Sequence, residues 1–442
     1  MYLPRIKIKT VDKYLSARGG LPVFAEVMDG LGLKRALTPH LPMNRIAVRT
    51  SSFDKFRALT LGLVAEADGL DATERLSHDP AFTAVCGRVN AANTYGDFLR
   101  RFGLPHCRKL NHALIDAALQ LRTRTEKRQS SITIKFDSTN HVQHGRKFEG
   151  GEVNYKGQYG LDSLLAFDEF GFQYWSDVRP GATYTSQGVS EPVDAIFRRV
   201  PPRIRRYALA DSGFCNAAFF KACWSQRVGF VTAMRANMSD PLIRRVTNWR
   251  PTKRLLFHDG RACELGTTLY RPTDFREVLR VVFMRALKPR EQAAGLFGDM
   301  RYDYHAFVTN IGEHELQNER LIEFYRTRSD VENCIKDMKN GFDLRHLPCT
   351  SLLANKAYAL IAAFAYNLVR FVAHVENPRR PHFAKLLRFK VLMLPVQVVK
   401  HSRKISFHFM KHHEREVSRW LSIIKTKFGF AGTDRQATTA AH

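Results

Sequence analysis

Residues 325–343 read YRTRSDVENCIKDMKNGFD, and this stretch indicates both a helix and a charged site along one side of it. At about 100° per residue, one stripe of such a helix carries a carboxylate, two cations and a phenol: Glu332, Arg328, Lys339 and Tyr325. An apolar stripe lies beside it, formed by Phe324, Val331, Ile335, Met338 and Phe342. We therefore expect the charged residues to lie at the rim of a buried face.

This combination suits a site that holds a metal ion and a phosphodiester together. The carboxylate can bind the metal, while the cations and the hydroxyl bind the non-bridging phosphate oxygens. The alternative is an amphipathic surface helix with an ordinary ion pair between Arg328 and Glu332, and for the helix alone this is the better interpretation. The rest of the chain favours the site.

Two aspartates stand at the ends of predicted strands. SITIKFD (131–137) is a β-rich run that ends in Asp137, and RRYALAD (205–211) ends in Asp211 before a Ser-Gly turn. Further strands are expected at residues 160–171, 172–181 and 229–236, with helices at about 184–199 and 216–226. The order β-β-β-α-β-α-β, with an aspartate on the first and fourth strands and a glutamate on a later helix, is that of an α/β, RNase H-like core.

The acidic residues Asp137, Asp211 and Glu332 resemble the catalytic triad of DDE transposases from bacterial insertion sequences. The insertion-sequence-four-like superfamily carries a Tyr-x2-Arg-x3-Glu-x6-Lys signature, known as YREK, and residues 325–339 match it at all four positions. Within that superfamily, the motifs FDST and ADSGF and the helical N-terminal region are similar to the group named after insertion sequence thirteen-eighty. The resemblance covers the chain from about residue 15 to about residue 375.

The resemblance implies a transposase that binds the terminal inverted repeats of an insertion sequence, cleaves the ends and joins their 3′-OH groups to target DNA by cut-and-paste. It implies that the triad holds two Mg²⁺ ions, for which Mn²⁺ can substitute. It also implies that Tyr325, Arg328 and Lys339 contact DNA. The expected partners are double-stranded DNA, as transposon ends and as target, and a second copy of the chain on that DNA. No membrane and no small-molecule substrate are expected.

The length and charge of the chain agree with a nucleic-acid partner, and its cysteines indicate the kind of compartment in which it works. The chain has 442 residues and a net charge of +27, which favours a folded protein that binds a polyanion. Its seven cysteines are odd in number and include no CxxC pair, which argues against a disulfide framework or a zinc site and favours a reducing cytoplasm. The resemblance implies that this is the bacterial cytoplasm, at the nucleoid. Residues 351–375 form a long apolar stretch, but polar residues interrupt it and favour a buried helix over a membrane span.

The chain is expected to contain five segments. They are a helical N-terminal domain at residues 1–125, the first part of the catalytic core at 126–235, a β-rich insertion at 236–308, the second part of the core with the Glu332 helix at 309–375, and a basic helical C-terminal region with a frayed tail at 376–442. The N-terminal domain is expected either to bind transposon ends or to dimerise. In the insertion, Trp249 is a candidate to stack on a flipped base, although a core tryptophan is the commoner role.

Two other functions stay open from the sequence. A stand-alone RNase H-like nuclease or resolvase would share the acidic triad but would need neither the insertion nor the YREK signature. A non-catalytic, DNA-binding descendant of a transposase is the second, and the intact acidic positions count against it.

Overall fold

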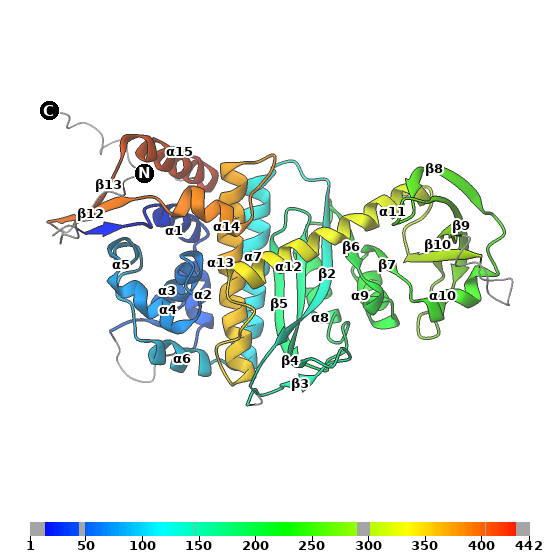
Figure 1. Cartoon of the computed structure of the whole chain (residues 1–442), viewed down its shortest axis with the longest axis horizontal. Coiled ribbons are helices and arrows are strands. Elements are labelled where there is room, and N and C mark those ends of the chain that lie inside the picture. The colour runs from blue at the N-terminus through cyan, green and yellow to red at the C-terminus, as the bar shows by residue number, and fades with distance from the viewer. Residues whose placement is uncertain (1–13, 44–48, 146, 290–300, 403, 430–442) are drawn as a thin grey trace, which may run out of the picture. The chain divides into compact units, whose positions relative to one another are not determined.

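A computed structural model describes residues 14–43, 49–145, 147–289, 301–402 and 404–429 (Figure 1). The chain is mixed α/β and divides into two compact units. The first unit contains the described residues within Met1–His106, Gly341–Asp343 and Phe364–His442. The second unit contains the described residues within Cys107–Asn340 and Leu344–Ala363.

The first unit is mainly helical in its N-terminal part. Its helices there are α1 (Leu21–Gly30), α2 (Leu33–Leu37), α3 (Ser52–Val64), α4 (Leu70–Arg75), α5 (Pro80–Cys86) and α6 (Ala92–Arg100). Helix α3 begins with a capping box, in which Ser51 and Asp54 exchange hydrogen bonds. At its other end, the buried Arg388 guanidinium donates to the carbonyls of Leu63 and Val64. A cation is favourable at this end of a helix, and it adds to the hydrogen bond that the Leu63 carbonyl accepts from the Glu66 amide.

The C-terminal region, expected to be helical, also contains two strands. Strand β12 (Val396–His401) pairs with β1 (Leu15–Ser16) on one side and with β13 (Lys404–Phe409) on the other. In the chain, β12 and β13 lie between helix α14 (Ala384–Leu387) and helix α15 (Lys411–Phe428). The buried Val396 and Val398 alternate with more exposed residues, which is the period of a strand rather than a helix. The predicted frayed tail, GTDRQATTAAH at residues 432–442, lies outside the described residues.

The second unit is built on one mixed sheet with the strand order β3-β4-β2-β6-β7-β11-β10-β9-β8, and β5 pairs with β4. These strands are β2 (Ser131–Val142), β3 (Glu152–Val153), β4 (Tyr159–Asp168), β5 (Gln173–Pro180), β6 (Arg205–Ala210), β7 (Gly229–Ala233), β8 (Arg250–Leu256), β9 (Ala262–Tyr270), β10 (Leu279–Leu287) and β11 (Tyr302–Thr309). Strands β2, β6 and β7 are parallel, whereas β4 is antiparallel to β2. The predicted strands and helices between residues 131 and 236 occur in the predicted chain order, and the short strand β3 is an addition to those predicted.

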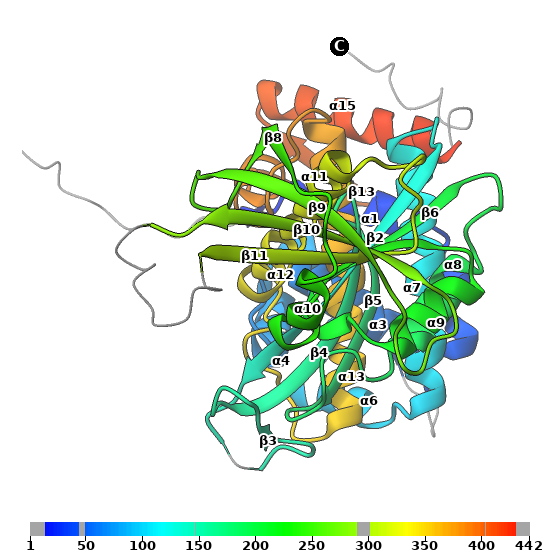
Figure 2. The ribbon, with the colours of Figure 1, turned by 90° about the vertical axis from the view of Figure 1, so that its right-hand side faces the viewer.

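The stretch expected as a β-rich insertion extends the core sheet. It begins with α10 (Ala236–Ile243), and its described residues then form the strands β8 to β11, which Figure 2 shows side by side. Strand β11 pairs antiparallel with β7, so the hydrogen-bond ladder continues from the core into the insertion. Leu209 of β6 and Val231 of β7 also share one apolar cluster with Val282 of β10. The insertion therefore shares both its ladder and its packing with the core strands.

The helices that lie wholly or partly in the second unit are α7 (Leu104–Thr125), α8 (Ser190–Phe197), α9 (Ala217–Ser225), α11 (Asn318–Arg326), α12 (Asp330–Gly341) and α13 (Leu352–Glu376). Helix α13 is long and apolar enough to cross a membrane, but 94% of its most apolar stretch is buried inside the protein. The prediction of a buried helix at residues 351–375 is confirmed.

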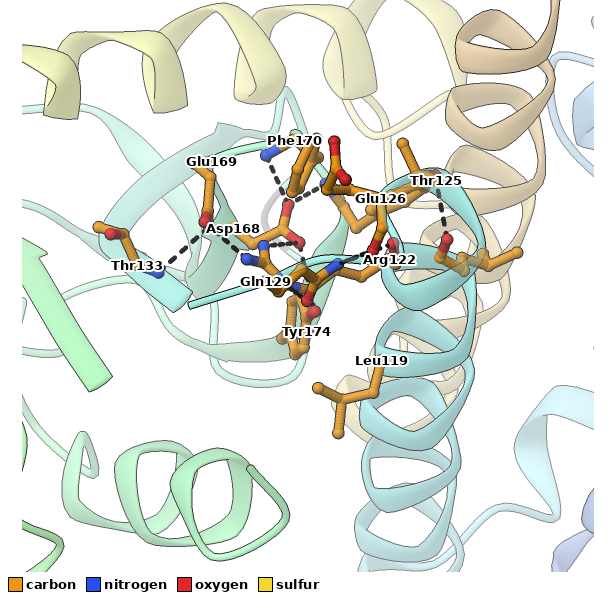
Figure 3. A network of polar contacts seen from close by, with 12 residues as sticks. Leu119, Arg122, Thr125, Glu126, Gln129, Thr133, Asp168, Glu169, Phe170 and Tyr174 are labelled. Atoms are coloured by element: carbon orange, nitrogen blue, oxygen red, sulfur yellow. Dashed lines mark hydrogen bonds and ion pairs between the residues drawn. The ribbon is translucent and has the colours of Figure 1, made fainter. Parts of the chain in front are cut away.

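A buried ion cluster joins α7 to the turn between β4 and β5 (Figure 3). The Arg122 guanidinium lies 3.1 Å from the Asp168 carboxylate and 2.7 Å from that of Glu169. It also donates to the Ser131 carbonyl at the start of β2, over 2.8 Å. Burial raises the pKa of Asp168, while Arg122 opposes the rise. The cluster ties α7, β2 and the β4–β5 turn together.

Candidate active site

Asp137 and Asp211 are neighbours on adjacent parallel strands. In the register of β2 and β6, Phe136 stands opposite Ala210, and each aspartate is the next residue. Asp211 directly follows β6, as predicted, but β2 continues to Val142, so the prediction that Asp137 ends its strand is wrong. The polar residues after Asp137 keep pairing with β4, and an apolar-run criterion does not detect such a polar extension.

Arg328 connects Asp137 with Glu332. Its guanidinium lies 3.3 Å from Asp137 Oδ2 and 3.0 Å from Glu332 Oε1. Burial raises the pKa of Asp137 to about 6; Arg328 opposes this rise, and the negative charges of Asp211 and Glu332 add to it. The negative charges of Asp211 and Glu332 therefore act on the Asp137 carboxylate, and Arg328 contacts both Asp137 and Glu332.

The residues of the signature do not lie on one continuous helix. A 3-10 turn at Thr327–Ser329 separates α11 from α12. Arg328 lies in this turn, from which its side chain reaches Asp137 on the sheet. The apolar stripe of α12 is buried as predicted: Val331, Ile335 and Met338. A fixed angle per residue describes each helix well, but it does not reveal the change of helix type between them.

Tyr325 and Lys339 already have protein contacts. The Tyr325 ring packs against Phe307 with centroids 4.9 Å apart, and burial raises the pKa of its phenol while Arg328 opposes the rise. The Lys339 ammonium donates over 2.5 Å to the carbonyl of Asn140 on β2. Burial lowers the pKa of Lys339. Lys339 therefore binds the backbone of the strand that carries Asp137.

A cavity of about 710 Å³ opens beside the two aspartates. Its lining includes two pairs of an aromatic ring and a cation that the sequence analysis missed: Tyr155 with Lys156, and Tyr184 with Arg235. The Arg235 guanidinium donates to the Tyr184 hydroxyl over 2.6 Å, and Lys156 Nζ lies 5.5 Å from the centroid of the Tyr155 ring. These four residues come from three loops, so only the adjacent Tyr155 and Lys156 leave a local signal in the sequence.

Trp249 lies on the insertion and not at the carboxylates. The carbon of the Arg285 guanidinium is 4.0 Å from the centre of the Trp249 ring, and Tyr304 and Phe283 lie beside it. Trp249 is half-buried, and it is absent from the described residues that line the cavity. The structure therefore places it in a separate cluster of aromatic and cationic side chains.

The neighbouring aspartates suit a hard divalent cation. Mg²⁺ takes oxygen ligands and is commonly held by one or two carboxylates together with substrate phosphates. Within the described residues, no group of three or more His, Cys, Asp or Glu side chains is close enough to hold a metal ion. Arg328 instead compensates the charges of Asp137 and Glu332. The donor chemistry of Asp137 and Asp211 fits Mg²⁺. In this structure the Arg328 guanidinium supplies part of the positive charge that balances the carboxylates of Asp137 and Glu332.

Replacing Asp137 with asparagine is expected to stabilise the metal-free protein at neutral pH. The pKa of Asp137 is raised from 3.8 to about 6 on folding, so the folded state holds its proton more tightly than the unfolded state. The stabilising effect of the protonated Asp137 side chain is fully present below pH 4 and is lost as the pH rises through about 6. We expect Asp137→Asn to gain on the order of 2–3 kcal/mol over wild type across this range. Urea unfolding from pH 4 to 8, in EDTA, measures it.

The control for this comparison is Asp240→Asn, a substitution at an exposed aspartate. Its difference from wild type should stay flat with pH. Mg²⁺ should in turn stabilise wild type more than Asp137→Asn, because binding to the folded state adds to stability. A difference between wild type and Asp137→Asn that does not change with pH would show that Asp137 is not destabilising when ionised.

Comparison with known proteins agrees with this geometry. A family model described as transposase DDE domain, group 1, matches residues 3–425. The matched stretch contains both aspartates, the glutamate and the cavity. No curated protein matches the chain. Since the match spans almost the whole sequence, the chain belongs to the family of the transposase DDE domain, group 1.

Proposed function

We propose that the protein is the DNA transposase of an insertion sequence, which cleaves the terminal inverted repeats and joins the 3′-OH ends to target DNA by cut-and-paste. Membership of the DDE transposase family implies DNA substrates. The observation that carries the proposal is the contact of Arg328 with both Asp137 and Glu332, beside a cavity that Asp137 and its register neighbour Asp211 line. The net charge of +27 suits the polyanionic substrate.

The topology supports an RNase H-like catalytic core. The strand order β5-β4-β2-β6-β7 combines one antiparallel hairpin with three parallel strands. Asp137 belongs to β2, Asp211 directly follows the neighbouring strand β6, and Glu332 comes from a helix that follows the insertion. Together with the YREK signature, this arrangement supports the insertion-sequence-four-like superfamily. The motifs FDST and ADSGF and the helical N-terminal region are the basis for proposing the thirteen-eighty group within it.

Asp137, Asp211 and Glu332 are proposed to hold two Mg²⁺ ions, for which Mn²⁺ can substitute. When bound, these ions supply Lewis-acid stabilisation of the attacking and leaving oxygens of the phosphodiester. The side chains of the chain supply the rest of the site. Arg328 contacts Asp137 and Glu332 with a forked donor, which is the shape that suits two non-bridging oxygens of the scissile phosphate.

The cavity wall is proposed to hold the DNA strand next to the scissile bond. Arg235 and Lys156 provide positive charge for phosphates, and the rings of Tyr184 and Tyr155 provide faces for a sugar or a base. Tyr325 and Lys339 extend this contact along α11 and α12. Trp249 is proposed to stack on a base at the insertion, where Arg285 lies over its ring.

The expected assembly is a homodimer on double-stranded DNA. Each chain contains one set of the three carboxylates, whereas an insertion sequence has two ends that must be cut and joined together. The helical part of the first unit is proposed to bind the ends or to form the dimer.

Incubation of the purified full chain with Mg²⁺ and DNA that carries the flanking inverted repeats tests this function. We expect cuts at the outer ends of the repeats, and joined products when target DNA is added. The matched control is the same DNA with scrambled repeats, on which no specific cuts are expected. Equal cutting of both DNAs would favour the nuclease or resolvase, and binding without cutting would favour the non-catalytic descendant.

A further inference from the structure

A buried lysine lies two residues before the first catalytic aspartate. Lys135 and Asp137 belong to β2, and residues two apart in a strand leave the same face of the sheet. The Lys135 side chain is only 2% exposed. Its position in SITIKFD, within an otherwise apolar and β-branched run, is one where a charged side chain is rarely buried without partners.

Within the part of the chain that the structure describes, the hydrogen-bond partners of the Lys135 side chain are Thr327 and Asp330, which lie at the junction of α11 and α12. Its ammonium donates over 2.5 Å to the carbonyl of Thr327 and over 3.0 Å to the carboxylate of Asp330. Thr327 begins the 3-10 turn after α11, and Asp330 begins α12. The Lys135 ammonium therefore binds both the start of the 3-10 turn and the start of α12.

The position of this contact sets where the catalytic side chains lie. Arg328 is the residue immediately after Thr327, and it reaches Asp137 from the turn. Glu332 lies in the first turn of α12, two residues after Asp330. Because the strand that carries Asp137 also carries Lys135, the contact links the two parts of the site directly.

The carbonyl contact provides the stronger part of this link. The Asp330 side chain is 67% exposed, so its ion pair with Lys135 is weakened by water. The Thr327 carbonyl lies at the C-terminal end of α11, where a cation is favourable. It accepts a hydrogen bond from Lys135 in addition to the one from the Asp330 amide of the 3-10 turn. An apolar side chain of similar length at position 135 would keep the packing and lose the attachment.

We infer that Lys135 is a positioning residue, which fixes the α11–α12 junction to β2 and thereby sets Arg328 and Glu332 relative to Asp137. This inference rests on the proposed DNA cleavage. Lys135 acts through the turn and touches neither the phosphate nor a metal ligand. Its loss should slow the chemical step, because small misplacements of catalytic groups are costly, and should leave the binding of DNA almost unchanged.

The test compares Lys135→Met with Lys356→Met. Lys356 of α13 forms an ion pair with Asp177 of β5 and is also largely buried, but it does not contact the α11–α12 junction. We expect Lys135→Met to lower the single-turnover cleavage rate about 100-fold, with DNA affinity within about twofold of wild type and thermal stability similar to that of Lys356→Met. Lys356→Met should cleave at nearly the wild-type rate.

Two further variants separate positioning from folding. Lys135→Arg keeps the charge and should restore part of the rate. Asp330→Asn changes an exposed side chain and keeps the carbonyl contact, so it should fold normally and lose less activity than Lys135→Met. A cleavage rate of Lys135→Met within about threefold of wild type, or an equal loss in Lys356→Met, would overturn the inference.

Hydrogen exchange decides the inference without DNA cleavage. In the metal-free protein, the amides of residues 327–334 should exchange faster in Lys135→Met than in wild type and in Lys356→Met. Unchanged exchange there would contradict the proposed attachment. If wild type does not cut the inverted repeats, the proposed function fails, whereas the exchange result still tests the attachment of the junction to β2.

Discussion

Asp137→Asn and Asp211→Asn should each lower the rate of DNA cleavage by about 1,000-fold or more, with DNA affinity unchanged. Each substitution removes one negative charge from the neighbouring pair while it preserves the volume of the side chain. The Asp211 carboxylate also accepts a hydrogen bond from the Gly213 amide over 2.8 Å, so its position is fixed by its own turn. Single-turnover cleavage of inverted-repeat DNA and fluorescence anisotropy measure the two quantities.

Glu332→Gln should have the same effect, and the matched control is Asp194→Asn at a surface ion pair with Arg198. Normal cleavage by a variant would remove that residue from the triad. For Glu332, the nearby acids do not offer a replacement in this conformation: Glu323 pairs with Arg254, and Asp330 pairs with Lys135. Loss of DNA binding in parallel with cleavage would instead assign the carboxylates a structural role.

Arg122→Met should lower the free energy of unfolding by about 3–5 kcal/mol. The substitution fills a similar volume but leaves the carboxylate of Asp168 buried without its cation. Burial already raises the pKa of Asp168, and the loss of Arg122 removes the charge that opposes this rise. The destabilisation should therefore shrink at acidic pH, where Asp168 takes up a proton, and grow at alkaline pH. Urea unfolding at several pH values measures it.

Arg199→Met is the control for this prediction. Arg199 also forms an ion pair with a residue of α7, Asp116, but both side chains are more exposed. Its loss should cost no more than about 1 kcal/mol. The double variant Arg122→Met/Asp168→Asn should recover part of the stability, because it removes the unpaired buried charge. Equal losses in Arg122→Met and Arg199→Met would show that the buried cluster contributes little.

The sequence predicts features of the site that depend on local patterns. Short apolar runs locate β2 and β6, and the aspartates follow from them because each stands directly after such a run. The apolar stripe at Val331, Ile335 and Met338 likewise follows from helical spacing. Composition and residue spacing are therefore enough to predict a feature when the residues that determine it lie close together in the chain.

Other features depend on contacts between distant segments. The 3-10 turn that carries Arg328 is held by Lys135, which lies almost two hundred positions earlier and looks in the sequence like an interruption of an apolar run. Tyr184 and Arg235 meet beside Asp137 because their loops converge on one cavity. The strands β12 and β13 were missed since a basic, His-rich composition obscured their alternation. Such features require the folded structure.

The placement of Glu332 after the insertion also has a consequence for the newly made chain. Asp211 leaves the ribosome 121 positions ahead of Glu332. At about 5–20 residues per second, this separation corresponds to roughly 6–24 s of translation. During that interval both aspartates have been synthesised, while Lys135 still lacks Thr327 and Asp330 as partners. The synthesis of strands β8 to β11 thus delays the completion of the acidic set, which the chain acquires only when Glu332 has been made, with 110 residues still to follow.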